Sequence, residues 1–151
     1  MRIEDHLRQS AGRFGSKTAL IAGETRLTYL ELDRLSGRLA TGLIARGLRE
    51  GDRVVMVAEN CAEAVVAFFA CWKAGAVPCP LHASIKRDKL RVIIDSTKPF
   101  AVLAQTRFCG VVDAAFSDAG RAPLKISFGA VPASGASDAK ASVLRVICVR
   151  K

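Results

Sequence analysis

Few residues of this 151-residue chain have types and spacings that could support chemistry. Cys79 and His82 have the spacing of half a zinc site, but no second pair of ligands follows them. The five cysteines are an odd number without close pairing, and we interpret them as buried thiols of a reducing compartment; they are Cys61, Cys71, Cys79, Cys109 and Cys148. These residues predict neither a metal site nor a disulfide framework.

The net charge of +9 raises the question of nucleic-acid binding, but its distribution favours no focused patch. Residues 121–151 contain six basic residues and one acidic residue, Asp138. The only basic run, Lys86–Lys89 with Arg91, is typical of a solvated helix face. No aromatic residues are interleaved with it as stacking platforms, so specific nucleic-acid binding is not expected.

The stretch from Leu27 to Leu81 contains the strongest structural signals. Thr28 and Glu31 form a capping box, with Leu27 and Leu32 at the positions of a hydrophobic staple. Leucines then recur at helical spacing up to Leu43, and Gly47 is a natural left-handed stop. The pattern predicts an amphipathic helix.

A strand–helix–strand unit follows this helix. The apolar run Val54–Ala58 predicts a strand covered on both faces. Asn60 and Glu63 repeat the capping pattern, Ala64–Trp72 is apolar all round, and Gly75 ends the helix. Ala76–Leu81 predicts the next strand. Such a crossover implies parallel strands and a right-handed connection.

The flanking segments complete the expected fold. Before the unit, an apolar face at helical spacing predicts a first helix; it comprises Ile3, Leu7, Ala11 and Phe14. Gly23-Glu24 predicts a type II′ turn that joins the strands 19–22 and 26–28 in a hairpin. After it, Ser84 and Thr106 are candidate helix N-caps. The predicted elements are a helix at 85–95, a strand at 100–104, a helix at 107–119 and a strand at 124–128. The fold class is therefore α/β: a partial three-layer parallel sheet with flanking helices and a small N-terminal β-hairpin.

The composition changes after residue 129. Residues 130–142 (AVPASGASDAKAS) are small and rich in Pro, Gly and Ser, which is typical of a linker. Val143–Val149 is a β-prone apolar run that would form an exposed sheet edge unless something pairs with it. We therefore expect two parts, 1–129 and 130–151, and possible partners are a separate chain or another copy joining through that edge.

The sequence also bears on location. No apolar run approaches the length that spans a bilayer, so no membrane span is expected. Glu4 and Asp5 stand where a secretory signal would be basic or apolar, so we expect a cytoplasmic protein.

Residues 27–105 resemble the N-terminal part of the adenylate-forming acyl- and aryl-CoA synthetases, the AMP-binding ligase superfamily. The matching segments, in order, are LTYLELDRLSGRLATGL, GLREGDRV, AENCAEAVVAFFACWKAGAV and PLHASIKRDKLRVIIDS. The resemblance implies a two-step ligase: a carboxylate attacks the α-phosphate of ATP to give an acyl-adenylate, and a thiol of CoA then displaces AMP. The fatty-acyl members, and thus fatty acid metabolism, look nearest.

The departures from the family decide what is expected of this chain. The family holds phosphates with a Ser/Thr/Gly-rich loop and a lysine, because loop N–H groups and a cation stabilise negative charge. Pro132–Ser137 with Lys140 lacks the paired threonines, the second glycine and the Pro-Lys ending, and the family's later motifs are missing. No catalytic, cofactor-binding or metal residue is therefore carried over, and ATP, Mg and CoA belong to the parent family. His82, Ser84 and Lys86 lie in a loop that approaches the CoA phosphate in some members, although the usual basic residue does not match.

Three function classes are considered. The first hypothesis is a truncated AMP-dependent acyl-CoA synthetase that is inactive by itself. The alternative is a non-catalytic interaction module that pairs through its open sheet edge with a separate remainder or another copy. Nucleic-acid binding rests on charge alone and comes third.

Overall fold

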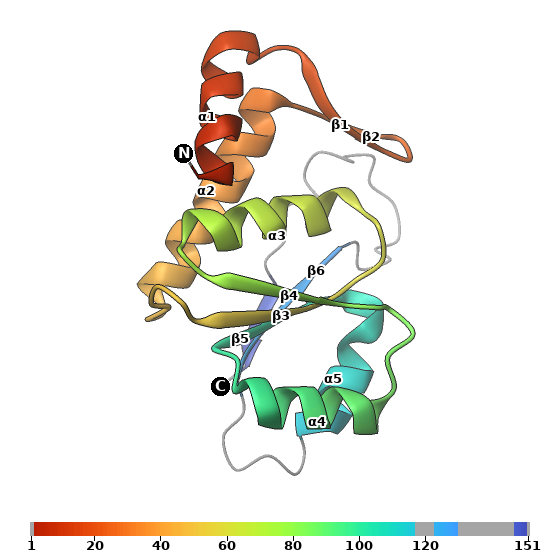
Figure 1. The fold of residues 1–151 in the computed structure, drawn as a ribbon. Coiled ribbons are helices and arrows are strands. Elements are labelled where there is room, and N and C mark those ends of the chain that lie inside the picture. Colours follow the sequence, from red (N-terminus) through yellow and green to blue (C-terminus); the bar gives the residue numbers. More distant parts are fainter. Residues whose placement is uncertain (1, 117–122, 130–146, 151) are drawn as a thin grey trace. The chain divides into compact units, whose positions relative to one another are not determined.

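The structure, a computed structural model, describes residues 2–116, 123–129 and 147–150. Helices and strands alternate through most of this part of the chain (Figure 1). The elements are α1 (Ile3–Phe14), β1 (Thr18–Ala22), β2 (Thr25–Thr28), α2 (Tyr29–Ala45), β3 (Arg53–Val57), α3 (Ala62–Lys73), β4 (Val77–Leu81), α4 (Arg87–Thr97), β5 (Ala101–Gln105), the 3₁₀ turn η1 (Thr106–Phe108), α5 (Cys109–Phe116), β6 (Leu124–Phe128) and β7 (Ile147–Arg150).

The chain divides into two compact units. One comprises Met1–Gly51 and Asn60–Val77, and it contains the hairpin with α1, α2 and α3. The other comprises Asp52–Glu59 and Pro78–Lys151, and it contains most of the sheet with α4 and α5.

Helix α2 begins with the predicted capping box. The backbone N–H of Glu31 donates to the Thr28 hydroxyl at 3.2 Å, and the Glu31 carboxylate accepts the N–H of Thr28 at 2.9 Å. Two otherwise unpaired N–H groups of the first turn are thereby satisfied. Leu27 and Leu32 are both buried, and Gly47 follows the helix at φ +97°, so the predicted start and stop of α2 are confirmed.

The N-terminal helix and the hairpin lie close to their predicted places. Leu7 and Ala11 are buried as expected, but Ile3 is 54% and Phe14 38% exposed, so the predicted apolar face is buried only at its centre. In the hairpin turn, Gly23 has a φ of +59° and Glu24 has a negative φ. These angles agree with the predicted type II′ turn.

The predicted cap of α3 is wrong. The helix begins at Ala62 with Cys61 as the extended N-cap residue, and no side chain makes a cap hydrogen bond. Asn60 therefore lies one position before the N-cap residue. The stop at Gly75 is confirmed, with φ +72°.

The main sheet has the strand order β4-β3-β5-β6-β7. Strand β3 is parallel to β5, and β5 is parallel to β6, with Val55 opposite Val102 and Val102 opposite Lys125. The predicted α/β class with a parallel sheet and an N-terminal hairpin is confirmed.

One face of the sheet packs against α4 and α5. The buried cluster joins alternate residues of β3 and β5 to both helices, namely Val55, Val57, Val102, Ala104, Leu90, Ile94, Val112 and Ala115. The residues between them on the strands, such as Met56 and Leu103, point to the opposite face and are also buried. Both faces of these strands are therefore shielded from water, as their continuous apolar runs predict.

Two other predicted caps differ in the structure. Helix α4 begins at Arg87 after Lys86, without a side-chain cap, because the Ser84 hydroxyl bonds to His82 instead. The Thr106 hydroxyl donates to the carbonyl of Phe128 at 3.0 Å, and so joins the ends of β5 and β6 rather than capping a helix. The helix that follows is α5, which begins two residues after the predicted start.

The two edges of the sheet differ. Strand β7 pairs with β6 in the antiparallel direction, so part of the predicted terminal strand, Ile147–Arg150, forms. Strand β4 carries Pro78 and Pro80, which have no N–H to donate. The backbone groups of alternate residues point to the same edge of a strand. Because β4 pairs with β3 along its other edge, Pro78 and Pro80 lie at the open edge of the sheet.

Several predictions fall outside the described residues. These are the linker-like segment 130–142, including Pro132–Ser137 and Lys140, the run 143–146 and the end of the predicted helix at 117–119. Within the described ranges, no helix combines the length and the apolar character that crossing a membrane requires.

Candidate functional site

The order of the strands marks one edge of the sheet as the place to look for a site. Strand β3 connects to its neighbour β4 on one side, whereas β5 connects to β6 on the other side. In open α/β sheets, ligands bind in the crevice outside the carboxyl ends of two strands whose connections diverge in this way. Here that point lies after Val57 and Gln105, where β3 and β5 end.

Three polar residues meet at this point. The backbone N–H of Glu59 donates to the Gln105 side-chain oxygen at 3.2 Å, and the Glu59 carboxylate forms an ion pair with Arg107. The Arg107 guanidinium also lies 4.9 Å from the centre of the Phe108 ring. Both charged side chains are about half exposed, so the pair is screened and binds the two loops together without creating a net charge.

The loop containing His82, Ser84 and Lys86 forms a local turn. His82 Nδ1 lies 2.8 Å from the Ser84 hydroxyl and accepts the backbone N–H of Ser84 at 3.2 Å. All three residues are exposed, and Lys86 is the residue before α4. A hydroxyl beside an imidazole resembles a nucleophile with its base, but here both nitrogen contacts serve a turn two residues long.

No metal centre forms among the described residues, where three or more His, Cys, Asp or Glu side chains nowhere gather. Cys79 is half-buried in β4, and His82 bonds to Ser84.

The thiols are shielded to different degrees. Cys71 is buried, whereas Cys61, Cys79 and Cys109 are half-buried. Burial raises the pKa of the Cys61 thiol, and the negative charge of Glu63 adds to the effect. Burial also raises the pKa of Cys109, although the nearby Lys125 ammonium opposes the shift. A raised pKa keeps a thiol protonated and unreactive, which is the opposite of what a catalytic cysteine needs.

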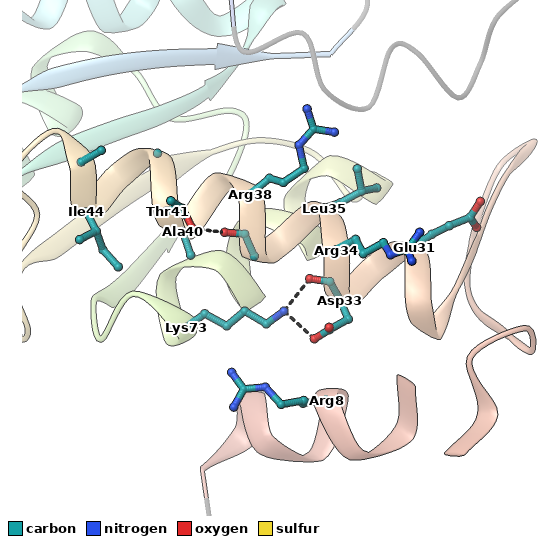
Figure 2. A pocket seen from close by; sticks show the side chains of 13 residues that line it. Arg8, Glu31, Asp33, Arg34, Leu35, Arg38, Ala40, Thr41, Ile44 and Lys73 are labelled. Carbon is teal, nitrogen blue, oxygen red and sulfur yellow. Dashed lines mark hydrogen bonds and ion pairs between the residues drawn. The ribbon is translucent and has the colours of Figure 1, made fainter. Parts of the chain in front are cut away.

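A groove runs along α2 in the other unit. It has a volume of about 990 Å³, and Figure 2 shows α2 along it with Arg8 from α1 and Lys73 from α3. The Lys73 ammonium donates to the Asp33 carboxylate and to the Asp33 backbone carbonyl, each at 2.6 Å. Because the Lys73 side chain is only 8% exposed, this ion pair fixes α3 against α2.

Sequence reasoning missed these interactions. Asp33 and Lys73 are 40 residues apart, and Glu59 and Arg107 are 48 apart, so no local spacing connects them. The one available signal was Lys73 itself, a charged residue directly after the apolar run of α3. His82, Ser84 and Lys86 follow the end of β4, the strand beside β3, and His82 and Ser84 contact each other there.

The fold and this edge define an α/β protein of the class that binds ligands beyond a parallel sheet. The chain belongs to the family of AMP-binding enzymes, which it matches over residues 7–144.

Known proteins agree with this assignment. Tyrocidine synthase 3 of Brevibacillus parabrevis is 31% identical over 116 residues, which cover 73% of this chain and 2% of that protein. Crotonobetaine/carnitine–CoA ligase of Escherichia coli O1:K1 / APEC is 31% identical over 112 residues, covering 68% and 22% of the two chains. The N-terminal domain of FACL13 from Mycobacterium tuberculosis has a TM-score of 0.74 and 27% identity, over 81% of this chain and 32% of that chain.

The coverage shows what part of the family fold is present. The chain spans 2% and 22% of the two curated relatives and corresponds to the N-terminal portion of such ligases. The family match continues beyond residue 129, and the division of the chain at that residue stays a prediction.

Proposed function

We propose that this chain provides the N-terminal part of an adenylate-forming acid–thiol ligase and does not complete the ligase reaction by itself. In that reaction, a carboxylate attacks the α-phosphate of ATP, pyrophosphate leaves, and a CoA thiol then displaces AMP from the acyl-adenylate. The supporting observation is the family match over residues 7–144 in a chain that spans 22% of a CoA ligase.

The described residues agree with a supporting role. At the carboxyl ends of β3 and β5, the charges of Glu59 and Arg107 offset each other. ATP, Mg²⁺ and CoA are proposed to bind where the rest of the family fold is present.

The finer assignments are also proposals. A fatty acid is the proposed acyl substrate of the complete ligase, from the resemblance of residues 27–105 to fatty-acyl members. The His82–Lys86 loop would face the CoA phosphate there, and the cytoplasm is the proposed location. Exchange of His82 and Lys86 for alanine in a complete ligase should raise the KM for CoA and leave the KM for ATP unchanged.

The first test is enzymatic. The purified chain is incubated with ATP, Mg²⁺, CoA and a panel of fatty acids, while pyrophosphate exchange and thioester formation are followed. We expect neither above the level of a heat-denatured sample. Formation of acyl-CoA by the chain alone would refute the proposal.

The alternative is an interaction module that pairs through an open sheet edge. The observation that favours it is β7, which is the last strand in the strand order of the sheet. Unlike β4, the strand β7 contains no proline. Sedimentation at several concentrations tests it. A monomer throughout, with no co-purifying chain, would count against this alternative.

A further inference from the structure

Three parallel strands of the main sheet end side by side at one edge. Strands β3, β5 and β6 are neighbours in the strand order, and the chain continues from β3 to β4 on one side but from β5 to β6 on the other. Ligands of open α/β sheets bind outside the carboxyl ends of strands whose connections diverge in this way. The side chains that follow these three strands therefore indicate which ligand chemistry this edge suits.

Neutral contacts already join the segments after these strands. The backbone N–H of Glu59 donates to the Gln105 side chain at 3.2 Å, which connects the ends of β3 and β5. The Thr106 hydroxyl donates to the last carbonyl of β6 at 3.0 Å. Gly129 follows β6 with φ +96°, and a Cβ on it would lie 3.4 Å from Gln105 Cγ. The edge is thus held together without the ion pair between Glu59 and Arg107.

Arg107 is held at this edge by an aromatic ring as well as by a carboxylate. Its guanidinium lies 4.9 Å from the centre of the Phe108 ring, and the attraction between cation and ring keeps it in place when Glu59 moves away. The Glu59 side chain is 53% exposed, so its ion pair with Arg107 is weak and its carboxylate can turn into water. Arg107 is therefore a positioned cation whose counter-ion is exchangeable.

We propose that Arg107 binds a phosphate group at this edge, and that Glu59 occupies the guanidinium until the phosphate replaces it. The planar donors of a guanidinium match two phosphate oxygens. A phosphate monoester carries a charge of about −1.5 to −2 at pH 7, more than the single charge of the Glu59 carboxylate. Inorganic phosphate and a small phosphate monoester both present this group. The inference does not depend on the proposed ligase function, because it rests on the ends of β3, β5 and β6 alone.

Titration of the isotope-labelled full chain tests the binding. Inorganic phosphate and glycerol 3-phosphate are added at constant ionic strength, while arginine Nε–H and backbone amide signals are followed by NMR. We expect saturable shifts of the Arg107 Nε–H and of the Glu59 and Gly129 amides. Tighter binding of glycerol 3-phosphate identifies the ligand as a monoester, and equal binding identifies it as phosphate itself. Glycerol should cause no shift. Shifts with glycerol, or none at Arg107 with either phosphate, would overturn the proposal.

A matched pair of variants tests the exchange of counter-ions. Glu59→Gln removes the competing carboxylate and should tighten phosphate binding at Arg107 about threefold, the size of an exposed ion pair. Asp95→Asn is the control, because it removes the carboxylate of a similarly exposed ion pair with Arg91 on α4. That variant changes the net charge equally and should leave the binding unchanged. Equal tightening in both variants would show a response to net charge alone and would overturn the proposal.

A second pair of variants tests the guanidinium itself. Arg107→Gln keeps a polar side chain without the charge, and should weaken phosphate binding at least about tenfold, as the loss of charge-assisted hydrogen bonds predicts. Arg91→Gln removes the same charge from α4 and should leave the binding unchanged. Circular dichroism checks that both exposed substitutions preserve the fold. Phosphate binding that persists in Arg107→Gln, read from the Glu59 and Gly129 amides, would contradict the assignment of Arg107.

Discussion

At the scale of single residues, the ion pair between Lys73 and Asp33 makes an asymmetric prediction. Asp33→Ala leaves the almost fully buried Lys73 ammonium with only a backbone carbonyl, and should destabilise the fold by about 2–3 kcal/mol. Lys73→Met leaves the Asp33 carboxylate, whose side chain is 24% exposed and reaches water, and should cost about 1 kcal/mol.

Urea unfolding followed by circular dichroism measures both variants. Arg38→Ala, which changes an exposed charge on the same helix, serves as the control and should stay within about 0.5 kcal/mol of the parent chain. A larger cost for Lys73→Met than for Asp33→Ala would contradict the burial argument.

The Cys61 thiol provides a prediction about pH. Burial raises the pKa of this thiol in the folded chain, so its thiolate should appear at higher pH than in the unfolded chain. The contribution of this thiol to folding stability is fully present below its pKa in the unfolded chain. That contribution is lost as pH rises through its pKa in the folded chain. Iodoacetamide labelling between pH 7 and 11, read by mass spectrometry, measures the midpoint. A midpoint equal to that in urea would contradict the prediction.

At the scale of elements, the start of α2 depends on two side chains. Thr28→Ala removes the hydroxyl that accepts the N–H of Glu31, and should cost about 1 kcal/mol. Thr41→Ala is the matched control, because its exposed hydroxyl only bonds back to the Gly37 carbonyl within α2. That variant should be neutral or slightly stabilising. Chemical unfolding of both proteins decides the matter, and equal losses would argue against the cap.

The elements also show how far sequence reasoning reaches. The Thr28–Glu31 cap was predictable because all its partners lie within one turn of helix. The same pattern failed at Asn60, where Cys61 takes the N-cap position, and at Ser84, whose hydroxyl bonds to His82. At Ser84 a short polar side chain had a competing local partner, which spacing alone does not reveal. The site-forming pairs were out of reach because tertiary packing brings distant segments together.

Strand β4 carries a prediction about association. Pro78 and Pro80 remove two donors from its open edge, and such gaps prevent the addition of another strand. Exchange of both prolines for threonine restores these N–H groups and should produce self-association that increases with concentration. Sedimentation velocity measures it, with Lys89→Thr as a control for surface change. A double variant that stays monomeric would show that the prolines do not protect this edge.

At the scale of the whole molecule, the parallel sheet and the family match indicate one portion of a larger catalytic fold. In this family the reaction needs a phosphate loop with a lysine, and Pro132–Ser137 with Lys140 does not supply its pattern. We therefore expect the chain and its ligase relatives to share a framework rather than a set of reacting groups. The size of the native polypeptide in its source cells decides whether the rest of the ligase fold belongs to the same chain.

An antibody against the first hundred residues tests this on a denaturing gel of native extract. A band several times heavier than 16.1 kDa would mean that the reacting groups lie in the same polypeptide, and the extract's ligase activity should then be removed by the antibody. With a band at 16.1 kDa, we would expect any activity to require a second chain that supplies the phosphate-binding groups. We expect the purified chain to be inactive in either case, and turnover by it alone is the result that would contradict this expectation.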